Sequence, residues 1–469
     1  MSDRWLALLS IAFVWGAGYA VARAIVPGDS DRRLSIQAGY GYFVGWLVTA
    51  GVLWLAAAWH VPVRMAVAIT AVVLAGAGAL AWTRWRSDGR PDTGFRAWWG
   101  AGKWPLRLAF CVFLSLVSLH VLMYGVEAWY RPLYAWDAWM HWAPKARVWT
   151  ELNEFAQFGP RDIAAAANSA VYTIRNWDYP TFIPLVQTWI SVPVGRWNDI
   201  VVGLPWPGAL VALLLAVYGQ VREMGFSPLA GVVAAWMLAS LPIVGVHTAL
   251  AGYADLWMAA IYGLAVAAAL KWVRDGDSGQ LVFAIVFTLA CPWVKVPGLA
   301  WLLTLLPVFL VRLVSPARLV ATCGAILVLV SLAMVLSGGD LTVPGVGRFV
   351  LNARHVGMPV LGYYTWGWQG VGKALASQMF LWPDWHLGAW LVVSSLAIFG
   401  VTGGESRKDL APWLLASGAV GFPLLVFLFT ERSAGVVHAQ TTYRAFLHAA
   451  PALVFASMAL AAGRLRRPQ

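Results

Sequence analysis

A carboxylate, an imidazole and an ammonium recur at every fourth residue in one segment of the chain, at Asp137, His141 and Lys145. Residues four apart lie on the same face of an α-helix, so these side chains are expected to form one polar stripe. The carboxylate can take a proton from a hydroxyl group, and a neighbouring cation would keep it ionised for that task. We therefore expect this stripe to be a site of chemistry, the alternative for Asp137 being that it only caps the following helix.

The rest of the chain has the composition of a membrane protein. Apolar residues make up 60% of the 469 residues, charged residues only 12%, and 30 residues are tryptophan. This composition excludes a soluble globular protein. About thirteen segments approach the ~20 residues that a helix needs to cross a bilayer. They are 5–26, 40–59, 65–82, 106–126, 200–221, 228–246, 253–273, 281–294, 298–313, 319–336, 387–401, 412–429 and 445–462. We predict an all-α polytopic membrane protein.

The net charge of +12 does not indicate nucleic-acid binding, because the basic residues are spread over short loops between the apolar segments. With the basic loop 84–107 in the cytoplasm, alternation puts the other basic loops on the same side, as the positive-inside rule requires. Those loops contain Arg32, Arg33, Arg222, Lys271, Arg274, Arg312, Arg318, Arg407, Lys408, Arg464, Arg466 and Arg467. The long segments 127–199 and 337–386 then face outward. We expect a multi-pass protein of the inner (plasma) membrane whose active site faces the periplasm or exterior.

These segments suggest two parts. Residues 1–104 are predicted to be an accessory transmembrane bundle, and residues 105–469 a catalytic module with external loops 127–199 and 337–386. The first loop contains short helical patterns. The last of them, after Pro180, is amphipathic and is expected to lie in the membrane interface. The second loop is rich in glycine and aromatic residues.

Five short motifs fall at predicted external positions. They are Asp137-x-Trp139-x-x-Trp142-x-x-Lys145-Ala146, Asp178-Tyr179-Pro180, Gly252-Tyr253-Ala254-Asp255-Leu256, Val294-Lys295-Val296-Pro297-Gly298 and Tyr443-Arg444-Ala445. In this order they resemble the fold-C integral-membrane glycosyltransferases, the superfamily of the dolichyl-phosphate-mannose protein mannosyltransferases and the bacterial lipid A aminoarabinose transferases. The resemblance runs from about Leu106 to the C-terminus. The chain departs from the family with Asn176-Trp177 in place of His-Pro, and with Val296-Pro297 in place of Asn-Glu.

The resemblance implies a sugar donor carried on a polyprenyl phosphate, an acceptor hydroxyl on a lipid, glycan or protein, and Asp137 as the catalytic base. The implied substrate-binding residues are Lys145, Asp178, Tyr179, Tyr253, Asp255, Lys295 and Arg444. No cofactor is predicted, although Asp137, Asp178 and Asp255 leave a divalent metal open. Two other functions stay open: an enzyme like the O-antigen ligases or polymerases, and a transporter or flippase for lipid-linked sugars.

Overall fold

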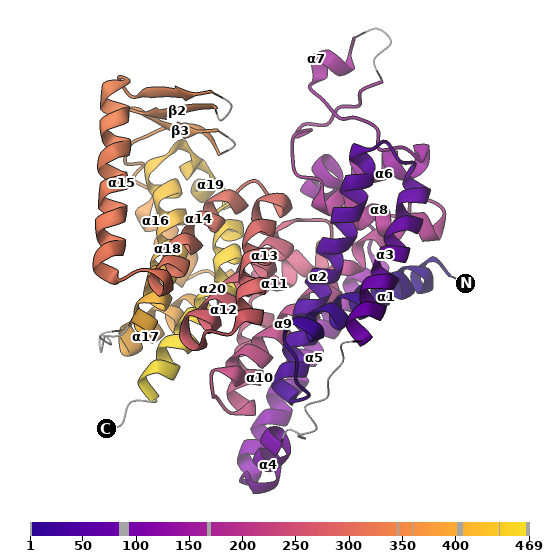
Figure 1. Cartoon of the computed structure of the whole chain (residues 1–469), viewed down its shortest axis with the longest axis vertical. Helices are drawn as coiled ribbons and strands as arrows, with labels where there is room; N and C mark the ends of the chain where they lie inside the picture. Colours follow the sequence, from indigo (N-terminus) through magenta and orange to yellow (C-terminus); the bar gives the residue numbers. More distant parts are fainter. Residues whose placement is uncertain are drawn as a thin grey trace. The chain divides into compact units, whose positions relative to one another are not determined.

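The computed structural model describes residues 2–83, 93–166, 170–344, 347–359, 361–400, 407–439 and 441–465. Within these ranges the chain forms twenty α-helices and one small sheet (Figure 1). It divides into two compact units: Met1–Leu264 with Trp293–Lys295, and Ala265–Pro292 with Val296–Gln469. The division between the compact units falls near residue 264, while the predicted accessory bundle 1–104 and catalytic module 105–469 stay a prediction.

In the first unit, helices α1 (Asp3–Ile25), α2 (Asp31–Ala58) and α9 (Pro205–Glu223) pack side by side. Glycines make this packing possible, because small residues let helix backbones approach closely. A Cβ atom on Gly18 of α1 would lie 2.0 Å from the carbonyl oxygen of Gly41 on α2. A Cβ atom on Gly39 would similarly lie 2.5 Å from the carbonyl oxygen of Ala212 on α9. The predicted accessory helices are therefore joined to α9 in one core.

The other elements of the first unit surround this core. They are α3 (Val63–Thr83), α4 (Thr93–Ala101), α5 (Trp104–Tyr130), the π-helical turn η1 (Ala138–Trp142), α6 (Ala143–Leu152), α7 (Arg161–Ala164), α8 (Phe182–Val194), the 3-10 turn η2 (Val201–Gly203), α10 (Pro228–Ala239), α11 (Pro242–Ala249) and the first half of α12 (Asp255–Asp275). Helix α8 corresponds to the predicted interface helix, but its residues from Phe182 to Ser191 are all buried. It packs against α1, α2 and α6. The expectation of a surface helix was therefore wrong at this position.

The second unit contains the rest of α12 and most of α13 (Ser278–Val294), then α14 (Gly298–Leu313) and α15 (Pro316–Leu336). Its later elements are α16 (Gly372–Phe380), η3 (Pro383–Trp385), α17 (Gly388–Gly400), α18 (Arg407–Phe429), η4 (Glu431–Ser433), α19 (Ala434–Val437) and α20 (Thr442–Leu465). Helix α18 packs between α14 and α20.

The predicted external loop 337–386 contains a four-stranded antiparallel sheet, which departs from the all-α prediction. Strands β1 (Asp340–Val343), β2 (Gly347–Leu351), β3 (His355–Met358) and β4 (Gly362–Thr365) are neighbours in chain order. About half of their residues are β-branched or aromatic, and successive residues alternate between two faces, which favours strands over helices.

The described helices include eight that are long and apolar enough to cross a membrane. Helices α10 and α11 make a possible ninth span, bent by 66° at Leu241. The other predicted spans coincide with apolar helices of 10–17 residues, such as α13 and α14. The chain is therefore a helical, multi-pass membrane protein, while the number thirteen stays a prediction.

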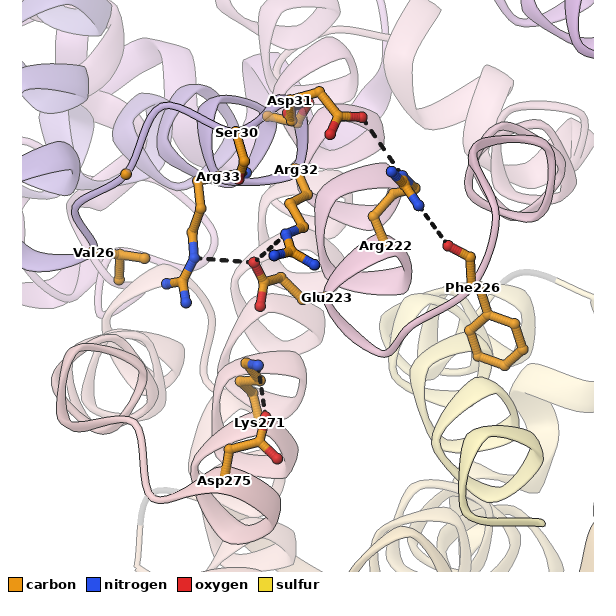
Figure 2. Close-up of polar contacts among 12 residues, drawn as sticks. Val26, Ser30, Asp31, Arg32, Arg33, Arg222, Glu223, Phe226, Lys271 and Asp275 are labelled. Carbon is orange, nitrogen blue, oxygen red and sulfur yellow. Dashed lines mark hydrogen bonds and ion pairs between the residues drawn. The ribbon is translucent and has the colours of Figure 1, made fainter. Parts of the chain in front are cut away.

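Within each unit, loops that are predicted to lie on the same side of the membrane contact each other. At one end of the first unit, Glu223 pairs with Arg32 at 3.2 Å and with Arg33 at 3.0 Å, and Arg222 lies 3.5 Å from Asp31 (Figure 2). All five residues come from predicted cytoplasmic loops or the adjacent helix ends. Loops predicted to be external also meet each other.

Two contacts illustrate the external set. In the first unit, Asn198 Nδ2 donates to Asp3 at 2.9 Å. In the second unit, the backbone N–H of Thr365 donates to Glu431 at 2.7 Å. The contacts within each unit therefore agree with the predicted alternation. Which end faces the cytoplasm stays a prediction.

Replacing Glu223 by glutamine is expected to destabilise the first unit. The carboxylate is almost fully buried and neutralises two arginines, so its loss leaves their charges uncompensated. Because both arginines are partly exposed, we expect a loss of about 1–3 kcal/mol, seen as a lower thermal unfolding midpoint in detergent. Glu151→Gln is the matched control, since Glu151 is half exposed and pairs along its own helix with Arg147. Equal midpoints for the two variants would contradict this prediction.

Candidate functional site

Asp137 directly precedes η1, where the helix is wider than an α-helix. The N–H of Ala143 bonds to the carbonyl of Ala138, five residues back. Pro144 follows in the first turn of α6 and has no N–H to donate four residues back, so a regular helix cannot run through this point. Single π-helical turns often occur at functional sites. The Asp137 side chain is shielded but still 15% exposed.

Two members of the predicted polar stripe, Asp137 and His141, lie close together, and Lys145 donates hydrogen bonds elsewhere. Lys145 is buried with only 3% of its surface exposed, and His141 is also buried. His141 Nε2 lies 4.0 Å from Asp137 Oδ1 and 3.5 Å from Asn176 Nδ2. The His141 and Trp142 rings both pack against the ring of Tyr179, at centroid distances of 5.4 and 5.3 Å. The Asp137 segment is thereby held against the turn that contains Asp178.

Lys145 fastens this turn. Its Nζ atom donates hydrogen bonds to the carbonyl oxygens of Trp177 at 2.7 Å and of Tyr179 at 2.9 Å. Burial lowers the pKa of Lys145 to about 8, although the nearby Asp178 carboxylate acts in the opposite direction. The Asp178 side chain itself stays exposed. The hydrogen bonds of Lys145 in the described structure hold the 177–179 backbone, while its predicted role in substrate binding stays a prediction.

The motif at residues 252–256 contacts the Asp137 segment at Gly252. Gly252 has a positive φ of 97°, and a Cβ atom there would lie 2.6 Å from the Cβ atom of Ala138. Only glycine fits both the backbone conformation and the space. The next residue, Tyr253, accepts a hydrogen bond of 2.8 Å at its carbonyl from Trp206 Nε1. The loop before α12 therefore packs directly on the first residue of η1.

Asp255 and Lys295 form an ion pair at the start of α12. Lys295 Nζ lies 2.5 Å from Asp255 Oδ1, and the Asp255 side chain has no exposed surface. A carboxylate in the first turn is also favoured by the positive end of the helix dipole. Because burying two charges costs several kcal/mol per ion, a pair at such a position usually serves more than stability. The third and fourth motifs thus meet in the first unit.

Arg444, the last predicted site residue, lies in the second unit near the start of α20. Its neighbour Tyr443 packs against Trp382 with ring centroids 6.1 Å apart. Seven of the eight predicted site residues therefore lie in the first unit and Arg444 lies in the second. Over the described ranges, no three histidine, cysteine or acidic side chains are grouped as metal ligands.

No protein-family model, curated protein or solved structure matches the chain. The glycosyltransferase resemblance therefore rests on the five motifs alone.

Replacing Lys145 by methionine is expected to loosen the turn at residues 176–180. The substitution keeps much of the buried volume and removes both hydrogen bonds to the turn. Amide hydrogen exchange in this segment should accelerate by about tenfold or more in the intact protein. Lys373→Met, at an exposed position of α16, is the control and should leave exchange in this segment unchanged. Unchanged exchange in Lys145→Met would show that the lysine does not hold the turn.

Proposed function

We propose that the protein is a membrane glycosyltransferase of the fold-C type. It would transfer a sugar from a polyprenyl-phosphate donor to a hydroxyl group of a lipid, glycan or protein acceptor at the external face. The observation that carries this proposal is the meeting of four motif segments in one unit: Ala138 touches Gly252, Tyr179 packs on His141 and Trp142, and Lys295 pairs with Asp255. These segments lie far apart in the sequence, and they are the ones that resemble the glycosyltransferase motifs.

Asp137 has the chemistry of the base in this reaction. Its carboxylate accepts the proton of the acceptor hydroxyl while the oxygen bonds to the anomeric carbon of the donor sugar. The bond from that carbon to the phosphate oxygen breaks, and the polyprenyl phosphate leaves with the electron pair. A positioned base contributes roughly 10²- to 10⁴-fold to such a step. Partial burial beside His141 supports this role, because a shielded carboxylate is less hydrated and better placed for proton transfer.

Lys295 is the proposed partner of the donor phosphate. An ammonium stabilises the charge that develops on the leaving phosphate, which is usually the larger contribution to catalysis. Asp255 holds this ammonium at 2.5 Å, and 13% of the Lys295 side chain is exposed, so one side stays accessible. Tyr253, Asp178 and Arg444 remain proposed substrate contacts. Lys145 and the Tyr179 backbone act as positioning groups, since they fix the turn beside Asp137.

A second candidate is a transporter or flippase for lipid-linked sugars, with an O-antigen ligase-like enzyme as a further alternative. The buried Asp255–Lys295 pair favours the transporter, because ionisable residues within membrane helices often mark a substrate path. The two classes differ in chemistry. A transferase forms a new glycosidic bond and uses Asp137, whereas a transporter moves the lipid-linked sugar unchanged.

Replacing Asp137 by asparagine is expected to abolish turnover while donor binding is retained. Purified protein in nanodiscs would be given polyprenyl-phosphate hexoses and pentoses, with product formation followed by mass spectrometry. Loss of the base should lower turnover by about 100-fold or more. Asp162→Asn, an exposed acid of the same predicted external loop, should behave like the wild type. Wild-type turnover in Asp137→Asn would refute this role, and transbilayer movement without glycoside formation would favour the transporter.

A further inference from the structure

The small sheet of the second unit has two different faces. Residues paired across an antiparallel sheet share a face, and successive residues alternate between faces. One face is half-buried and apolar, with Leu341, Val343, Phe349, Val356, Met358 and Tyr364. The opposite face has exposed side chains at Asp340, Thr342, Arg348, His355, Tyr363 and Thr365, together with the buried Val350. We call this second surface the polar sheet face, and the chemistry proposed above does not use it.

A flat aromatic ring lies at the centre of the polar sheet face. Tyr363 is paired with Gly357 on β3, and a Cβ atom on Gly357 would be 2.2 Å from Cδ1 of the tyrosine ring. The Tyr363 hydroxyl donates a hydrogen bond of 2.8 Å to the carbonyl oxygen of Arg348 on β2. The ring therefore lies across the sheet, over Gly357, with its end fixed. Half of the side chain, 50%, remains exposed.

Paired polar groups flank this ring. Near the end of the ring that carries the Tyr363 hydroxyl, Arg348 Nε donates a hydrogen bond of 2.8 Å to Asp340 Oδ1. In the neighbouring row, Glu431 accepts hydrogen bonds from the backbone N–H and the hydroxyl of Thr365. These bonds hold the pKa of Glu431 below its usual value, with smaller effects from Arg432 and His355. Each charged group thus has a polar partner nearby, and neither sign of charge dominates the face.

We propose that the polar sheet face binds a neutral saccharide chain and serves as the docking surface for a glycan acceptor. This inference rests on the proposed function and names the acceptor class. A pyranose ring has an apolar C–H face that packs on an aromatic ring and a rim of hydroxyl groups. Fixed pairs of donors and acceptors, such as Arg348 with Asp340, suit that rim.

The charge pattern favours this partner over two others. An anionic membrane surface is recognised by clusters of basic residues, whereas Arg348 is neutralised by Asp340 on this face. A protein interface has an exposed apolar core, whereas the exposed side chains of this face other than Tyr363 are polar and the apolar Val350 is buried. An uncharged, hydroxyl-rich chain is the class that complements a flat ring within balanced polar groups.

The test is saturation-transfer NMR and titration on the purified full-length protein in detergent. The probes are cellotetraose, mannotetraose and chitotetraose, with tetragalacturonate and phosphatidylglycerol vesicles as charged comparisons. The wild type is expected to bind at least one neutral tetrasaccharide. Tyr363→Ala should weaken that binding by about tenfold or more, since a central aromatic contact is lost. Tyr363→Trp should retain binding, and Tyr130→Ala, at an exposed tyrosine of the first unit, should have no effect.

Gly357→Ala provides a second variant, because a methyl group there would displace the Tyr363 ring without removing it. Because the added Cβ atom would also lie 2.9 Å from the Tyr363 Cα atom, we expect weaker saccharide binding together with a local loss of stability in the sheet. The inference is overturned if no neutral probe binds, if only the charged probes bind, or if Tyr363→Ala lowers stability while binding is unchanged. In that last case, Tyr363 only covers Gly357 in the sheet.

Failure of this inference is distinguishable from failure of the proposed function. Asp137→Asn should bind the tetrasaccharide like the wild type, because Asp137 is not part of the polar sheet face. Saccharide binding without any glycosyl transfer would therefore refute the proposed transferase activity but not the proposed saccharide-binding surface. Glycosyl transfer at an unchanged rate in Tyr363→Ala would refute the proposed saccharide-binding surface but not the proposed transferase activity.

Discussion

A fully buried carboxylate at the start of a membrane helix is the constraint on which the first unit depends. The Asp255 carboxylate pairs with Lys295 at 2.5 Å, which offsets part of the cost of burying both charges. Since the pair must form, the residues before α12 and the turn after α13 are fixed relative to each other. Gly252 then brings the same loop onto Ala138, next to Asp137. One ion pair thus connects two segments forty residues apart to the candidate base.

The two lysines of the site illustrate how similar groups acquire different roles. Lys145 is buried and donates hydrogen bonds to two backbone carbonyls, so it holds the turn beside Asp137 in place. Lys295 keeps a partly exposed side chain and a carboxylate partner that can hold it while a phosphate approaches. Under the proposed function, the first lysine organises the base and the second neutralises the leaving group. The sequence placed both lysines among the substrate-binding residues and Lys145 also on a stripe with Asp137, without distinguishing their roles.

Features set by short stretches of sequence were predictable, and those set by distant contacts were not. Apolar length and charged loops gave the membrane class and the grouping of Arg32, Arg33 and Arg222 at one end. Helix α8 was misplaced because Thr188 and Ser191 look like a solvent-facing side, whereas their hydroxyls bond to backbone carbonyls inside the core. The contact of Gly252 with Ala138 depends on residues more than a hundred positions apart, so no local pattern could show it.

The most direct test is a cryo-EM map of the wild-type protein extracted with its native lipids into nanodiscs. If the protein is a transferase with a lipid-borne donor, a polyprenyl phosphate should co-purify, with its phosphate beside Lys295 and its sugar position within reach of Asp137. A map in which Lys295 contacts Asp255 alone, while the lipid phosphate lies elsewhere, would contradict the assignment of donor and base.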